Sequence, residues 1–78
     1  MKLEITKHAR ERMETYNVSD DLLISAVTNP DIIVDGYSNR RIYQKKLNGY
    51  ILRVIVEENK DIKRIITVYK SRSGRYGI

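Results

Sequence analysis

The chain has 78 residues, no cysteine and a net charge of +5, with 15 lysines and arginines against 10 aspartates and glutamates. This length suits one domain, and the lack of cysteine excludes a disulfide framework and a cysteine metal site. No apolar run is long enough to span a bilayer and no secretory leader is visible, so we expect a cytoplasmic protein without a membrane partner.

The positive charge is concentrated in the second half of the chain. Residues 1–35 hold four basic and seven acidic side chains, whereas residues 36–78 hold eleven basic and three acidic ones. A basic half beside a mildly acidic half is typical of a protein that binds a polyanion with one surface. A lysine-rich surface that is merely solvated has the same composition, so charge alone does not decide between the two.

Two short helices are predicted in the first half, after a short lead-in at residues 2–5. Thr6 is a suitable N-cap for a helix over residues 7–16, where apolar residues recur at helical spacing. Ser19 is a suitable N-cap for a second helix, which Asn29-Pro30 ends because the residue before proline disfavours the helical conformation.

The chain after Pro30 is predicted to form strands joined by short turns. The strand-like runs cover residues 32–34, 41–47, 50–58 and 62–70. Asn48-Gly49 between two of them is a strong hairpin signal. We therefore predict one α+β domain over residues 1–78, with two N-terminal helices packed on one face of a roughly four-stranded antiparallel sheet.

Alternation along the strands predicts two different faces for this sheet. The face under the helices should carry Leu52, Val54, Val56, Ile66 and Val68. The open face should carry Arg53, Ile55, Ile65, Thr67 and Tyr69, joined in simple register by Arg41, Tyr43 and Lys45. Basic side chains neutralise phosphates and tyrosine rings stack on unpaired bases, which predicts an RNA-binding face. An ordinary half-exposed sheet face also contains tyrosine and threonine, because both form strands well.

His8, the only histidine, lies in the first turn of the first predicted helix. Arg12 follows four residues later and therefore shares a helix face with it. Histidine suits proton transfer near neutral pH, and arginine stabilises phosphate charge. A lone histidine at the boundary of a helix also commonly has only a packing or capping role.

The sequence contains no metal-ligand motif, no glycine-rich phosphate loop and no serine-nucleophile motif, so we expect neither metal nor cofactor. RNA cleavage without metal is chemically accessible, because the 2′-hydroxyl of RNA itself attacks the adjacent phosphate. In the basic tail, Arg72 and Arg75 could clamp a phosphate and Tyr76 could stack on a base. A frayed basic tail is the alternative.

Several segments together resemble one group of proteins. They are His8-Ala9-Arg10-Glu11-Arg12-Met13, Asn29-Pro30-Asp31, Leu52-Arg53-Val54-Ile55-Val56, Ile66-Thr67-Val68-Tyr69 and Arg75-Tyr76. With them the chain looks like a small domain family grouped with the RelE/ParE-like toxins and related metal-independent ribonucleases. The resemblance implies a RelE-like fold of two helices and four strands. It also implies an active site made of His8, Arg12, Thr67, Tyr69 and Arg75.

Three functions are consistent with these features. The first is a toxin-like, metal-independent endoribonuclease that cleaves RNA, either free or as mRNA on the ribosome. In it His8 moves the proton, Arg12 and Arg75 stabilise the phosphorane, and Thr67 or Tyr69 orients the phosphate. The second is a non-catalytic nucleic-acid-binding module. The third is a protein-inhibiting toxin of the ParE kind, and both toxin functions imply a small acidic antitoxin protein as a partner.

Overall fold

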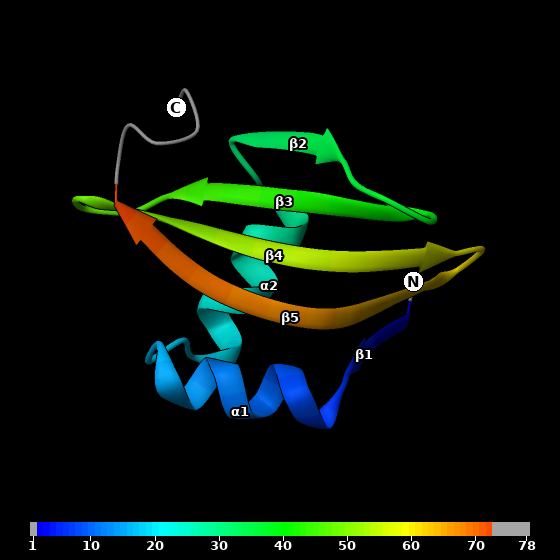
Figure 1. The fold of residues 1–78 in the computed structure, drawn as a ribbon, viewed down its shortest axis with the longest axis horizontal. Coiled ribbons are helices and arrows are strands. Elements are labelled where there is room, and N and C mark those ends of the chain that lie inside the picture. The colour runs from blue at the N-terminus through cyan, green and yellow to red at the C-terminus, as the bar shows by residue number, and fades with distance from the viewer. Residues whose placement is uncertain (1, 73–78) are drawn as a thin grey trace.

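The computed structural model describes residues 2–72, which form two helices and a five-stranded sheet (Figure 1). The helices are α1 (Lys7–Thr15) and α2 (Asp20–Thr28). The strands are β1 (Lys2–Ile5), β2 (Ile32–Asp35), β3 (Arg40–Lys46), β4 (Tyr50–Asn59) and β5 (Ile62–Arg72). The α+β class with two N-terminal helices is therefore confirmed.

The predicted lead-in is a strand, and this strand makes the sheet mixed. β1 pairs in parallel with the first part of β5, with Lys2 opposite Ile62 and Ile5 opposite Ile65. The other three pairs are antiparallel, and the strand order is β1-β5-β4-β3-β2. The prediction of roughly four antiparallel strands was therefore wrong. Within the described chain, no strand pairs with the outer edge of β5 beyond Ile65.

Both helices begin at the predicted caps. The hydroxyl of Thr6 accepts a hydrogen bond from the backbone N–H of Ala9 at 3.1 Å, and the hydroxyl of Ser19 accepts one from Leu22 at 3.1 Å. Each bond satisfies a backbone donor that the first turn of a helix leaves without a partner. Asn17, between the helices, adopts a left-handed conformation with a φ of 57°, which turns the chain toward α2.

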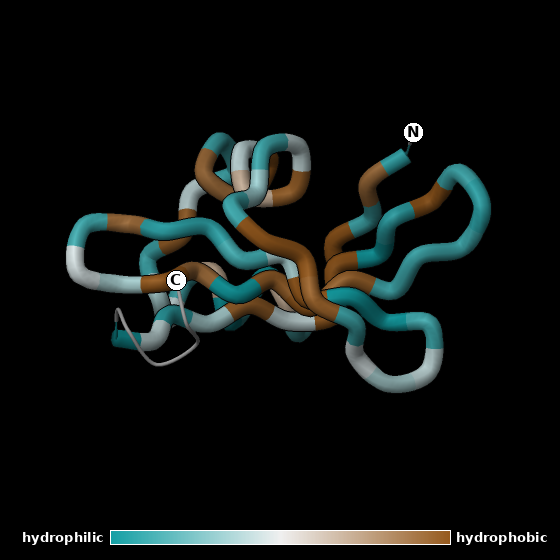
Figure 2. The backbone as a smooth tube through the Cα atoms, turned by 90° about the horizontal axis from the view of Figure 1, so that it is seen from above, coloured by the Kyte–Doolittle hydropathy of each residue, from teal (hydrophilic) through white to brown (hydrophobic). Residues whose placement is uncertain are grey.

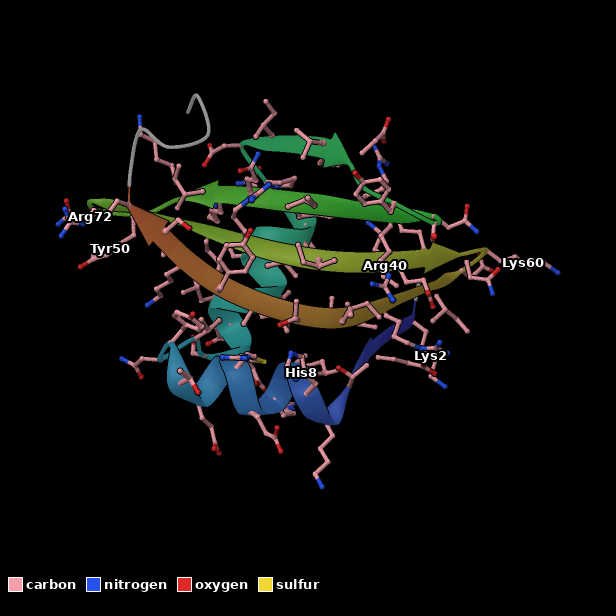
Figure 3. All side chains as sticks on the ribbon, viewed as in Figure 1. Lys2, His8, Arg40, Tyr50, Lys60 and Arg72 are labelled. Atoms are coloured by element: carbon pink, nitrogen blue, oxygen red, sulfur yellow. The ribbon has the colours of Figure 1, made fainter. Side chains whose placement is uncertain are left out.

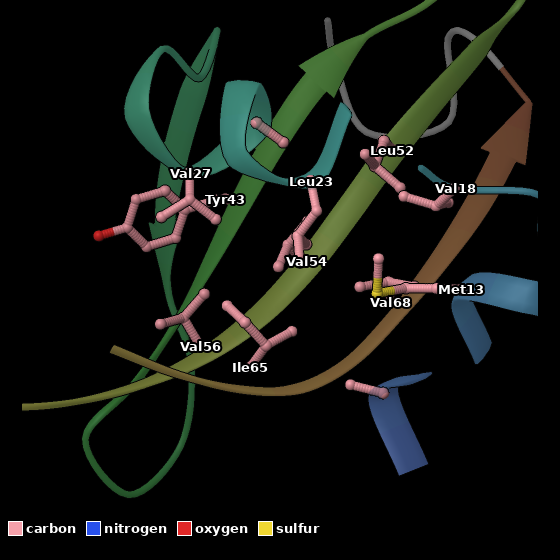
Figure 4. Close-up of a cluster of buried hydrophobic side chains, with 12 residues drawn as sticks. Met13, Val18, Leu23, Val27, Tyr43, Leu52, Val54, Val56, Ile65 and Val68 are labelled. Atoms are coloured by element: carbon pink, nitrogen blue, oxygen red, sulfur yellow. The ribbon is translucent and has the colours of Figure 1, made fainter. Parts of the chain in front are cut away.

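The core lies between the helices and one face of the sheet (Figure 4). α2 crosses behind this face, and α1 lies along β5 at the lower edge of the sheet in Figure 1. The core side chains are Ala9, Met13, Val18, Leu23, Ala26, Val27, Tyr43, Leu52, Val54, Val56, Ile65 and Val68. Figure 2 shows the hydrophobic stretches running through the middle of the molecule, with mostly hydrophilic loops at both ends.

A β-bulge in β5 changes which side chains reach the core. Ile55 pairs with Thr67 but Val56 pairs with Ile65, so Ile66 is an extra residue in the strand. Ile65 is fully buried in the core, whereas Ile66 is only partly buried. The predicted places of Ile65 and Ile66 were therefore wrong. Leu52, Val54, Val56 and Val68 do lie in the core, as predicted.

The two faces of β3 are exchanged relative to the prediction. Tyr43 lies opposite Val54, is only 2% exposed, and packs in the core beside Val27 (Figure 4). Arg41 and Lys45 share its face by alternation, so none of these three residues lies on the open face and that prediction was wrong. Gln44, opposite Arg53, takes the open face in their place.

Thr6 ties the start of α1 to β5, and we predict that Thr6→Ala lowers the free energy of unfolding by about 1–2 kcal/mol. Besides capping α1, its hydroxyl donates a hydrogen bond to the carbonyl oxygen of Ile65 at 2.9 Å. Thr15→Ala is the control, because the hydroxyl of Thr15 contacts only the carbonyl of Glu11 on an exposed turn. The control should change stability by less than about 0.5 kcal/mol in urea unfolding. Equal losses in the two variants would contradict the anchoring role.

Candidate active site between helix α1 and strand β5

A groove of about 220 Å³ lies between α1 and the part of β5 after Ile65, which no longer pairs with β1. It is lined by His8, Arg12, Tyr16, Thr67, Val68 and Tyr69. His8 and Arg12 of α1 and Tyr16, the residue that caps the C-terminal end of this helix, are spaced four apart and therefore project from the same side. Figure 3 shows His8 on the side of α1 that faces β5. Because His8 and Arg12 are exposed, a ligand can reach both from solvent.

Four of the five residues that the resemblance implies as catalytic line this single groove. His8 and Arg12 reach it from α1, and Thr67 and Tyr69 reach it from β5. The fifth residue, Arg75, lies outside the described residues, as does the predicted RNA-binding residue Tyr76. The residues that line the groove therefore bring together an imidazole, a guanidinium and the hydroxyl groups of Tyr16, Thr67 and Tyr69 from distant parts of the chain.

Arg53 extends the polar lining from the groove onto the open face of the sheet. Its Nη1 atom donates a 2.6 Å hydrogen bond to the phenol oxygen of Tyr69, and its guanidinium carbon lies 5.6 Å from the centre of the Tyr69 ring. A guanidinium has donors only, so the phenol hydrogen of Tyr69 points away from Arg53. The pair is opposite in the register of β4 and β5, and this geometry holds the Tyr69 ring in place.

Gln44 continues the same row on β3, opposite Arg53. It is only 2% exposed, and its side-chain oxygen Oε1 has no hydrogen-bond partner among residues 2–72. Leaving a buried acceptor without a partner costs about 1–3 kcal/mol, so native proteins rarely retain such an atom without a reason. Sequence analysis missed Gln44 because the assumed register placed its neighbours Tyr43 and Lys45 on this face.

Two of the predicted RNA-binding residues have structural contacts on the helix side of the sheet. Tyr43 is buried, and the ammonium group of Lys63 lies 4.6 Å from the centre of its ring. Lys45 donates a 3.0 Å hydrogen bond to the carbonyl oxygen of Asn29 at the C-terminal end of α2. These contacts explain both side chains through packing and helix capping.

Arg41 and Arg72, also predicted to bind RNA, lie at opposite ends of the sheet. The Arg41 guanidinium is 3.8 Å from the carboxylate of Asp35 and 3.5 Å from that of Glu58. Arg72 is exposed at the end of β5, opposite Tyr50. Charge neutralisation therefore weakens the case for Arg41 and leaves that for Arg72 intact.

Residues 2–72 hold no group of three or more acidic or histidine side chains that could bind a metal ion. The two helices of this part of the chain are too short and polar to cross a membrane. Two other grooves of about 470 Å³ each are lined by charged residues, but Arg10 in one is paired with Asp20, and Arg41 in the other is paired with Asp35 and Glu58.

These features define an α+β domain with a polar groove beside an open sheet edge. The chain belongs to the family described as Domain of unknown function (DUF4258), whose model matches residues 5–70. The match includes every residue that lines the groove. Comparison with curated proteins and with solved structures found no significant match.

The buried amide of Gln44 leads to a stability prediction. We expect Gln44→Met, which keeps the size of the side chain and removes the amide, to raise the free energy of unfolding by about 1 kcal/mol, because it removes a buried acceptor without a partner. Urea unfolding measures the change. As a control, Gln44→Ala removes the same acceptor but leaves a cavity, and should destabilise the fold. A loss of stability in Gln44→Met would mean that the amide is satisfied in solution.

Proposed function

We propose that this domain is a toxin-like, metal-independent endoribonuclease whose active site is the groove between α1 and β5. The observation that carries the proposal is the convergence of His8, Arg12, Thr67 and Tyr69 on one solvent-accessible groove. An imidazole, a guanidinium and two hydroxyl groups are the side-chain types that RNA cleavage by 2′-hydroxyl attack requires.

The chemistry assigns each group a role. The 2′-oxygen of RNA forms a bond to the adjacent phosphorus and the bond from phosphorus to the 5′-oxygen breaks, leaving a 2′,3′-cyclic phosphate and a 5′-hydroxyl. His8 accepts the proton of the attacking hydroxyl and returns it to the departing 5′-oxygen. Arg12 stabilises the negative charge of the phosphorane. Tyr69 or Thr67 donates a hydrogen bond to a non-bridging phosphate oxygen.

Arg53 supports this site through Tyr69. Its 2.6 Å hydrogen bond and its position beside the ring fix the phenol, and its positive charge favours a phosphate close by. We therefore assign Arg53 as a positioning residue. Pre-organised groups of this kind lower the barrier because they need not reorient during the reaction.

The toxin assignment extends to cellular partners. We propose that the domain acts in the cytoplasm on RNA, free or ribosome-bound, and is neutralised by a small acidic antitoxin protein. The net charge of +5 supports both partners, because each is an anion. A non-catalytic nucleic-acid-binding module is the second candidate. The basic residues at the end of the sheet near the β3–β4 turn favour it, because they could bind phosphates without any catalysis.

The decisive test is cleavage of labelled RNA in excess EDTA. We expect the native chain to release fragments with 2′,3′-cyclic phosphate ends, and His8→Ala to be slower by at least about 100-fold, because general base catalysis contributes about that much or more. Lys7→Ala is the control, since Lys7 is exposed on the same helix and does not line the groove.

Two results would count against the nuclease. Full activity of His8→Ala, with the fold intact by circular dichroism, would remove His8 from the mechanism. No cleavage by the native chain, on free RNA or on translating ribosomes, would leave the binding module.

A further inference from the structure

The two ends of the sheet differ in charge balance. At one end the turn between β3 and β4 meets the last part of β5; we call residues 45–53 and 67–72 the hairpin end. The hairpin end contains five basic residues and no acidic one, and the carboxylate of Asp31 adjoins it by accepting a 2.6 Å hydrogen bond from the backbone N–H of Lys46. The opposite end, residues 2–5, 35–41 and 57–64, contains six basic and five acidic residues. The excess positive charge of the sheet therefore gathers beside the groove.

The two ends of the sheet also differ in how many of their basic residues form ion pairs. At the opposite end Arg64 lies 3.2 Å from the carboxylates of both Glu4 and Glu57, and Arg41 is paired in the same way with its two acidic neighbours. At the hairpin end neither Lys70 nor Arg72 has a carboxylate within 4 Å among the described residues. Cations held close together without counter-charges favour the binding of an anion.

Tyr50 adds an aromatic surface to this end. Its side chain is 51% exposed although the residue begins a strand, and it lies opposite Arg72 in the register of β4 and β5. Figure 3 shows Tyr50 and Arg72 together at one tip of the molecule, with Lys60 at the other tip and Arg40 and Lys2 in the same half as Lys60. An exposed ring beside an arginine is a stacking platform for an unpaired base.

The hairpin end is continuous with the groove along β5. Thr67 and Tyr69 line the groove, and Lys70 and Arg72 follow on the same strand. By alternation Lys70, Arg72 and Tyr50 project from the face that also carries Leu52 and Val68, opposite to the side chains of Thr67 and Tyr69, so the path runs along the edge of β5. At about 3.3 Å per strand residue, the path from Thr67 to Arg72 is roughly 17 Å long. A chain of phosphates held in the groove would thus reach Arg72 and Tyr50 after a few nucleotides.

We propose that the hairpin end binds the single-stranded RNA that leaves the groove, with Lys70 and Arg72 on its phosphates and Tyr50 stacked on one base. The identification of the ligand as RNA rests on the proposed function. Single strands are favoured over duplexes because only an unpaired base offers its face to Tyr50.

The test is a binding measurement that needs no cleavage. A labelled single strand of RNA with every 2′-hydroxyl methylated cannot be cut by 2′-attack, and fluorescence anisotropy over a range of salt concentrations reports its affinity. Tyr50→Thr, which keeps strand propensity and removes the ring, should weaken binding at least about fivefold. Tyr50→Phe should bind like the native chain. Tyr37→Thr is the control, since Tyr37 is 92% exposed in the turn between β2 and β3.

Charge is tested with two matched double variants. Lys70→Gln with Arg72→Gln should lower the salt dependence of binding by about 1.4 in slope, because each phosphate contact with a single strand contributes about 0.7. Arg40→Gln with Lys60→Gln removes the same charge at the opposite end, from two exposed residues, and should leave the slope nearly unchanged. Thermal unfolding of each variant verifies the fold.

The outcomes separate this inference from the nuclease. Binding that depends on the hairpin end, without cleavage of unmethylated RNA either free or on translating ribosomes, would refute the nuclease and keep the inference. Cleavage that depends on His8, with hairpin-end variants binding like their controls, would refute the inference and keep the nuclease. Equal affinity for duplex RNA, or no binding of the methylated strand by the native chain, would also overturn the inference.

Discussion

The arrangement of this domain depends on the bonds that Thr6 makes to β5 at the point where β1 ends. Its backbone N–H and its hydroxyl both donate to the carbonyl oxygen of Ile65, at 3.2 and 2.9 Å, and the same hydroxyl caps α1. The chain therefore leaves the sheet and begins a helix beside the strand it has just paired with. As a result α1, rather than another strand, lies along the second part of β5, and the groove is the space between them. A longer β1 would fill that edge with backbone hydrogen bonds and leave no room for side chains from a helix.

The residues of the groove could be predicted because each belongs to a locally regular segment. Helical spacing places His8 and Arg12 on one face, and alternation places Thr67 and Tyr69 on one face, whatever the rest of the fold. The non-local features were missed for physical reasons. β1 is four residues long and pairs with residues about 60 positions later in the sequence. No local sequence pattern predicts such a pairing. The bulge at Ile66 inserts one residue and reverses the alternation before it.

The register of β3 was within reach of the sequence. The Asn48-Gly49 turn was recognised, and it leaves Leu47 and Tyr50 as the flanking pair, joined by a 2.7 Å hydrogen bond from the N–H of Leu47. Counting outward from that pair places Tyr43 opposite Val54 and Gln44 opposite Arg53, as observed. The Asn48-Gly49 turn therefore fixes the register of β3 against β4, which strand alternation cannot do. Alternation assigns residues to two faces of one strand but does not show which faces of neighbouring strands lie on the same side.

Gln44, Lys70 and Arg72 have the same physical character, since in each of them a polar or charged group has no partner among the described residues. Gln44 holds an amide oxygen without a partner in a nearly closed position, and Lys70 and Arg72 hold positive charges away from any carboxylate of the described chain. At the opposite end of the sheet, comparable basic residues are neutralised by ion pairs. Selection for stability alone would favour carboxylate partners for the basic residues at both ends of the sheet. Lys70 and Arg72 follow the groove residues on β5, and Gln44 lies two strands away in the row that leads to Tyr69. Donors, acceptors and positive charge in these places suit the anionic ligand of the proposed function. A phosphate chain drawn to the basic end would then be presented to His8 and Arg12 along β5, which is the orientation that the proposed reaction needs.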